Sequence, residues 1–242
     1  MEFMLAWKSQ DYLDSRPGYM HPYIKSLQKA FLKSADPSIA EGQSAYMKNL
    51  FPFHGIKTDL RRKITKDHFN SYSLLDEKTL YEIVYELWLL PQREYQYTAV
   101  ELIHFHRKIY SIHTIECIEY CITHKSWWDT VDALNTLGAG IYFEKFPAGI
   151  KEITGRWNAS TNMWLNRSSL LFQLKYKSNT DPALLSSYII NLSASKEFFI
   201  RKAIGWILRE YAKTDPGWVK KFVAQHSISS LSSREALKNI SA

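Results

Sequence analysis

Two side chains that could act together on a positive charge, Trp128 and Asp132, lie four residues apart in the sequence. At that spacing an indole and a carboxylate project from the same side of a helix. A carboxylate stabilises a cation that develops beside it, and the face of an indole attracts a cation by about 0.5–2 kcal/mol. The pair is therefore one candidate for a site that stabilises a cation. The alternative interpretation is a core tryptophan beside a solvated aspartate.

Two later segments repeat this combination of aromatic and charged residues. Trp164 is followed by Arg167, and Phe199 is followed by Lys202. Trp128, Trp164 and Phe199 succeed one another at intervals of 36 and 35 residues, which is a spacing typical of helical repeats. In the third segment Gly205 directly precedes Trp206, so that a neighbouring element could approach closely beside an exposed ring.

The elements that must position these side chains are predicted to be helices. A proline follows a helix-capping aspartate at three places, and further start signals stand at Pro22, Thr58 and Asp76, with a stop at Pro91. The three Asp-Pro pairs are Asp36-Pro37, Asp181-Pro182 and Asp215-Pro216. Because strand and hairpin signals are weak, we expect an all-α chain of about a dozen helices. The repeat interval favours a solenoid of stacked antiparallel hairpins with a concave face.

The composition is that of an ordinary globular protein with a basic surface. The chain has 242 residues, of which 45% are hydrophobic and 23% charged, and its formal net charge is +7. Such a balance suits a polyanionic partner, although excess charge also simply keeps a protein in solution. A signal-peptide pattern and an apolar stretch of roughly 20 residues are both missing from the sequence, so we expect a cytoplasmic protein.

One cluster of potential metal ligands is interpreted as structural. His113, Cys117, Cys121 and His124 fall on one predicted helix. A single straight helix cannot place four ligands tetrahedrally around zinc, so we expect two buried thiols and two partly exposed histidines. The segment Gly138–Gly140 lacks the flanking pattern of a phosphate-binding loop.

Taken together, the charged and aromatic segments resemble the AlkD family of DNA alkylation repair glycosylases. The resemblance extends from Met20 to Ile240 and leaves residues 1–19 as an N-terminal arm before a single 20–242 domain. Besides the segments above, the matching stretches are Ala45–Asn49, Gly55–Thr58, Arg61-Arg62, Glu86–Trp88, Lys175–Lys177 and Ser233–Ala236. The resemblance implies a solenoid of HEAT-like repeats whose concave face binds DNA.

The resemblance also implies roles for individual residues. The family's catalytic carboxylate corresponds to Asp132, its two active-site tryptophans to Trp128 and Trp206, and its DNA-contacting arginine to Arg167. We expect the further DNA contacts to come from Tyr46, Lys48, Lys57, Lys125 and Lys202. Lys57 departs from those relatives that have glutamine there, and Lys125 could equally cap a helix end.

The expected activity is that of a monofunctional DNA glycosylase. Its substrates would be cationic N3- and N7-alkylated purines in duplex DNA, and it would act as a monomer without metal or organic cofactor. Two alternatives stay open. A non-catalytic binder of damaged or branched DNA would have no reason to keep Asp132 among tryptophans. A protein-interaction solenoid would favour exposed leucines and acidic residues on its concave face.

Overall fold

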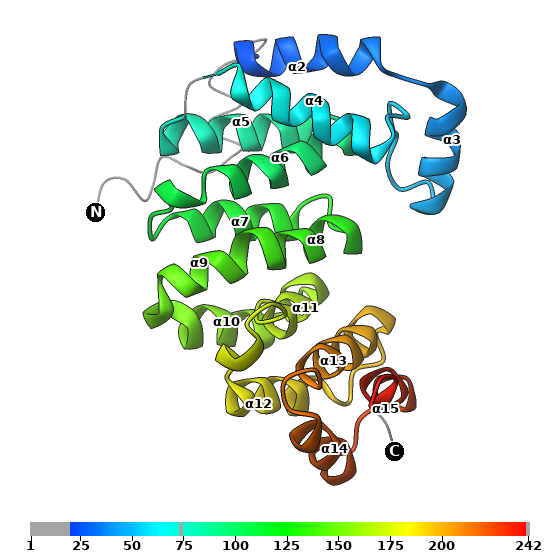
Figure 1. Cartoon of the computed structure of the whole chain (residues 1–242), viewed down its shortest axis with the longest axis vertical. Coiled ribbons are helices and arrows are strands. Elements are labelled where there is room, and N and C mark those ends of the chain that lie inside the picture. The colour runs from blue at the N-terminus through cyan, green and yellow to red at the C-terminus, as the bar shows by residue number, and fades with distance from the viewer. Residues whose placement is uncertain (1–19, 73–74, 241–242) are drawn as a thin grey trace. The chain divides into compact units, whose positions relative to one another are not determined.

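The computed structural model describes residues 20–72 and 75–240, and in these ranges every regular element is a helix (Figure 1). The prediction of an all-α fold is therefore confirmed. The predicted N-terminal arm, residues 1–19, lies outside the described residues. None of the helices in the described ranges could span a membrane. The described residues form two compact units that divide between Tyr110 and Ser111.

In its described residues the first unit has five α-helices and one short 3-10 helix. They are α2 (Pro22–Lys33), α3 (Pro37–Tyr46), α4 (Thr58–Asn70), α5 (Glu77–Leu89), α6 (Arg93–Phe105) and η1 (Arg107–Ile109). α5 packs against α6, and α4 packs against both α2 and α6. The apolar positions of the helical period form the core between them, including Leu27, Phe31, Leu80, Val84 and Trp88.

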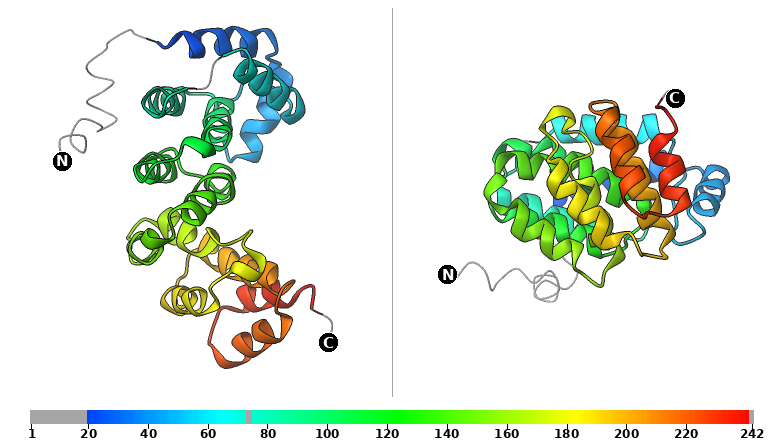
Figure 2. Two further views of the ribbon diagram at one scale, coloured as in Figure 1. Left: turned by 60° about the vertical axis from the view of Figure 1, so that its left-hand side comes forward. Right: turned by 90° about the horizontal axis from the view of Figure 1, so that it is seen from below.

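The second unit carries all the residues for which catalysis is predicted. Its α-helices are α7 (Thr114–Thr123), α8 (Trp128–Leu134), α9 (Gly140–Lys145), α10 (Ile150–Asn158), α11 (Met163–Leu171), α12 (Pro182–Leu192), α13 (Phe198–Tyr211), α14 (Pro216–Gln225) and α15 (Ser230–Leu237). A π-helical segment, η2 (Asn135–Ala139), joins α8 to α9, and η3 (Pro147–Gly149) and η4 (Lys177–Asn179) are single 3-10 turns. α11 packs against α8 and against α13, and α13 lies beside α15 (Figure 2).

Most of the predicted helix starts are confirmed. The aspartates at 36, 76, 181 and 215 each precede a helix and accept a hydrogen bond from a backbone N–H of its first turn. Thr58, one of the predicted start signals, is itself the first helical residue of α4, and the N-cap residue is Lys57, whose side chain makes no capping hydrogen bond.

The two cysteines are buried in α7, as predicted. The helix is shorter than expected, because His113 and His124 occupy its two cap positions and are exposed there.

Candidate active site

The centre of the site is an ion pair between Asp132 on α8 and Arg167 on α11. Arg167 Nε donates to Asp132 Oδ1 at 2.8 Å, and Nη2 donates to Oδ2 at 2.9 Å. The third guanidinium nitrogen, Nη1, donates to the carbonyl oxygen of Phe199 on α13 at 2.5 Å. The side chains of Arg167 and Asp132 are only 5% and 16% exposed. This parallel two-point geometry fixes the orientation of the carboxylate and joins three helices at one point.

The surroundings of Asp132 change its acidity. Burial raises the pKa of the carboxyl group above its ordinary value of 3.8, and the nearby Asp129 acts in the same direction. The hydrogen bonds and the charge of Arg167 lower the pKa, but burial is the larger effect. A partly desolvated carboxylate interacts with a nearby cation more strongly than a carboxylate in water does.

Aromatic rings surround the guanidinium. Arg167 Cζ lies 6.0 Å from the ring centre of Phe199 and 6.0 Å from that of the half-buried Trp206. The ring centre of Phe199 is in turn 5.1 Å from those of Trp127 and Trp164, which lie 5.8 Å from each other. We call Trp127, Trp164 and Phe199 the aromatic cluster.

Trp127 belongs to this cluster, although helical spacing in the sequence points to its neighbour Trp128. Trp127 has an extended backbone (φ −157°, ψ 161°) at the cap position of α8, and Trp128 is the first helical residue. Spacing along a helix could identify only the tryptophan inside the helix. Trp128 is half-buried and shares α8 with Asp132 at the predicted i and i+4 positions, and its catalytic role stays a prediction.

The contacts of Arg167 differ from those expected. The resemblance implies a contact with a DNA phosphate, whereas the guanidinium here is buried against Asp132 and the Phe199 carbonyl. In this arrangement it orients the carboxylate. Its phosphate contact stays a prediction.

Gly205 allows the close approach that its position beside Trp206 suggested. A Cβ atom at Gly205 would lie 2.5 Å from Glu235 Cβ and 2.9 Å from the carbonyl oxygen of Ser232, both on α15. Glu235 in turn forms an ion pair with Lys202 at 3.0 Å and a second one with Arg209. Lys202, a predicted DNA contact, therefore already has an acidic partner.

The other predicted DNA contacts are divided between the units. Tyr46, Lys48 and Lys57 belong to the first unit and are exposed, Tyr46 to 69%. Lys125 belongs to the second unit, where it is half-buried in the loop before α8 and has a positive φ of 47°. The structure thus brings Asp132, Arg167 and Trp206 together, and their predicted roles remain predictions.

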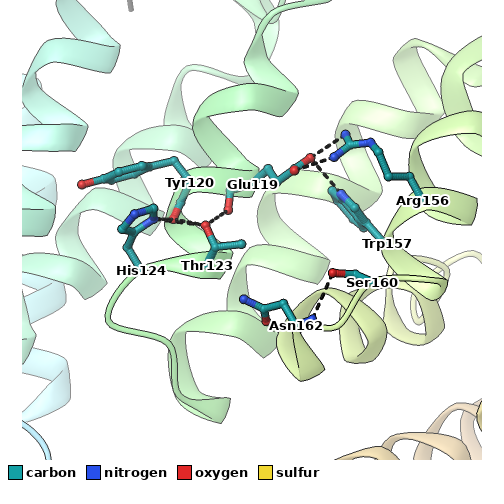
Figure 3. A network of polar contacts seen from close by, with 8 residues as sticks. All are labelled: Glu119, Tyr120, Thr123, His124, Arg156, Trp157, Ser160 and Asn162. Carbon is teal, nitrogen blue, oxygen red and sulfur yellow. Dashed lines mark hydrogen bonds and ion pairs between the residues drawn. The ribbon is translucent and has the colours of Figure 1, made fainter. Parts of the chain in front are cut away.

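Glu119, Arg156 and Trp157 form a second polar network between α7 and α10, two helices that both pack against α11 (Figure 3). Glu119 on α7 accepts hydrogen bonds from both terminal nitrogens of Arg156 on α10, at 2.7 and 2.8 Å, and from Trp157 Nε1 at 2.9 Å. Burial alone would raise the pKa of Glu119, but the hydrogen bonds from Arg156 and Trp157 hold it below its ordinary value. The network ties α7 to α10 and so stabilises the framework of the site.

Comparisons with known proteins give a consistent result. Residues 27–240 match a family model described as DNA alkylation repair enzyme. The chain is also similar to a solved structure described as a predicted DNA alkylation repair enzyme from Enterococcus faecalis, with 31% sequence identity and a TM-score of 0.81. That similarity covers 86% of this chain and 97% of the other, and it supports the predicted helical-repeat fold. No curated protein matches the chain.

Proposed function

The chain belongs to the family of DNA alkylation repair enzymes, and from this we propose that it is a monofunctional DNA glycosylase. Its substrates are N3- and N7-alkylated purines in duplex DNA. The observation that carries the proposal is the half-buried Asp132 carboxylate, which Arg167 orients at two points beside the aromatic cluster and Trp206.

The chemistry of the lesion explains why one carboxylate is sufficient. A purine alkylated at N3 or N7 is a cation, so it takes the electron pair of the breaking N-glycosidic bond and leaves as a neutral base. The sugar then carries positive charge, which a nearby carboxylate stabilises. Water adds to the sugar C1′ and its proton passes to Asp132 or to solvent. The raised pKa of Asp132 makes it a better proton acceptor than an ordinary aspartate.

The aromatic and cationic residues complete the proposed site. Trp128 and Trp206 attract the charged lesion through their ring faces, and the aromatic cluster keeps water away from the ion pair. Arg167 keeps both oxygens of Asp132 in place. Tyr46, Lys48, Lys57, Lys125 and Lys202 contact backbone phosphates. The net charge of +7 adds a general attraction to DNA.

The test is release of free base from duplex DNA that carries a single 7-methylguanine. The expected products are free 7-methylguanine and an unbroken strand with an abasic site. Tight binding without base release would instead support a non-catalytic damage binder. A strand break that forms without added heat or alkali would contradict the monofunctional assignment.

A further inference from the structure

The segment that connects α3 to α4, residues 47–57, has an unusual backbone. Lys48 and Asn49 both have φ near 58°, and Gly55 has φ 85°. Left-handed conformations are unfavourable for residues other than glycine, so a segment with two such residues in succession must be held by its surroundings. Lys48 and Lys57, both predicted DNA contacts, stand on this segment, which we call the connecting loop.

The second half of the connecting loop is held by one buried carboxylate. Glu94 on α6 is 1% exposed. Its Oε1 accepts hydrogen bonds from the backbone nitrogens of His54, Gly55 and Ile56 at 3.0, 3.0 and 3.3 Å, and its Oε2 accepts from His54 at 3.1 Å. Three consecutive amides therefore point at one negative charge, and hydrogen bonds to an ionised acceptor are the stronger kind.

The same part of the connecting loop also packs against Asp36, the N-cap residue of α3. The backbone nitrogen of Asp36 donates to the carbonyl oxygen of His54 at 2.9 Å. A Cβ atom at Gly55 would lie 1.9 Å from the carbonyl oxygen of Asp36, so the loop reaches this position only with glycine.

The first half of the connecting loop is held by Arg93, the residue before Glu94 on α6. The guanidinium of Arg93 lies 3.8 Å from the ring centre of Phe51, and the residue is 0% exposed. Its backbone nitrogen donates to the carbonyl oxygen of Pro52 at 2.9 Å. Two adjacent residues at the start of α6 thus hold both halves of the loop.

We propose that Arg93 and Glu94 are positioning residues that preform the connecting loop for duplex DNA. They fix the backbone that presents Lys48 and Lys57 to phosphates before DNA binds, so little ordering remains to be done on association. This inference rests on the proposed function, because the polyanion that the lysines meet is the DNA substrate. Burying a carboxylate is unfavourable unless it is hydrogen-bonded. The hydrogen bonds that Glu94 accepts all come from backbone amides of the connecting loop, so they fix the conformation of that loop.

The test compares Glu94→Gln with Glu101→Gln, which removes a carboxylate from the same helix. Glu101 pairs with Arg61 at 2.9 Å and serves as the matched control. We expect Glu94→Gln to weaken duplex affinity by about tenfold while the single-turnover excision rate at saturating protein stays unchanged. Glu101→Gln should leave the affinity within about twofold of wild type.

A double-mutant cycle of Glu94→Gln with Lys57→Ala measures whether Glu94 acts on DNA binding through Lys57. In the wild-type background Lys57→Ala weakens binding, and in the Glu94→Gln background it has a smaller effect, because the lysine is no longer held in place. Glu94→Asp keeps the charge but shortens the side chain, so it should fall between wild type and Glu94→Gln. It also provides a usable variant if Glu94→Gln folds poorly.

Amide hydrogen exchange on the DNA-free protein measures, independently of DNA affinity, how firmly Glu94 holds the backbone amides of the loop. We expect the amides of His54, Gly55 and Ile56 to lose protection in Glu94→Gln and to keep it in Glu101→Gln. Unchanged DNA affinity in a Glu94 variant whose loop amides have lost protection overturns the inference. A wild-type protein that binds no duplex DNA overturns the proposed function as well, and that failure is recognised without any variant.

Discussion

At the scale of single residues, Asp132 has two properties that oppose each other. Burial makes the carboxyl group harder to ionise, and Arg167 makes it easier. The result is a carboxylate with a raised pKa and a fixed orientation, which suits a group that must meet a short-lived cation. Because the guanidinium of Arg167 is buried, losing the Asp132 carboxylate would leave that positive charge without its counter-charge.

Replacing Asp132 by asparagine should reduce base excision by a factor on the order of 10²–10³, because the negative charge beside the sugar is lost. Thermal stability should fall too, since Arg167 stays buried without a counter-charge. Single-turnover rates measured well below the melting temperature separate the two effects. An Asp132→Asn protein that excises at the wild-type rate would refute the catalytic role.

The pH dependence of excision should report the raised pKa of Asp132. Activity needs the ionised form, so the rate should fall as the pH drops through a pKa that lies above 3.8. Arg167→Met removes the contacts that lower this pKa and should move the acid limb to higher pH. Single-turnover excision rates of the wild type and of Arg167→Met, measured from neutral to acid pH, give the acid limb of each protein. If the acid limbs of the two proteins coincide, Arg167 does not control the pKa of Asp132.

The same shift has a consequence for stability with a definite sign. A carboxyl whose pKa is raised on folding binds its proton more tightly in the folded protein. Its contribution is therefore favourable at low pH and is lost as the pH rises from 3.8 through the folded pKa.

How much of the site could be predicted depended on the kind of signal. The sequence pointed to Asp132, Arg167 and Trp206, and in the structure Arg167 contacts Asp132 and lies beside Trp206, while their catalytic and binding roles stay predictions. The burial of Arg167 could not be predicted, since it depends on the Phe199 carbonyl from a third helix. Trp127 was missed because its ring is positioned by the turn before α8 and not by helical spacing.

At the scale of elements, close packing between helices depends on Gly205. Gly205→Ala places a Cβ atom 2.5 Å from Glu235 Cβ, so α15 must move away from α13. We expect a loss of about 1–3 kcal/mol in the free energy of unfolding. The control is Gly42→Ala on α3, where no atom lies within 4 Å of the new Cβ, and this change should be neutral or stabilising. Denaturant titrations measure both, and equal effects would contradict the packing role.

Helix starts were predictable because an Asp-Pro pair acts locally, through one cap and one fixed φ. The π-helical segment η2 was not predictable. Directly after it Gly140, the first residue of α9, brings the chain against the carbonyl oxygen of Phe172, from which a Cβ atom would lie 2.8 Å, and such a contact is decided by tertiary packing.

At the scale of the whole molecule, a net charge of +7 should make duplex binding depend steeply on salt. Each phosphate contact that is lost should make the log–log slope shallower by about 0.9. Lys57→Ala is therefore expected to reduce both affinity and slope, as measured by titrations at several salt concentrations. Affinity that stays flat between low and moderate salt would favour a protein-interaction solenoid.

The central claim is that Asp132 acts on lesions that are already cationic. We assign no general acid to the departing base, so a neutral base, which would leave as an anion, should depart far more slowly. The most direct measurement is single-turnover release of free base from two duplexes that are identical except for the lesion, one with 7-methylguanine and one with uracil. We predict rapid release of 7-methylguanine and no enzymatic release of uracil. Release of uracil at a comparable rate would contradict the claim, and so would a failure to release 7-methylguanine.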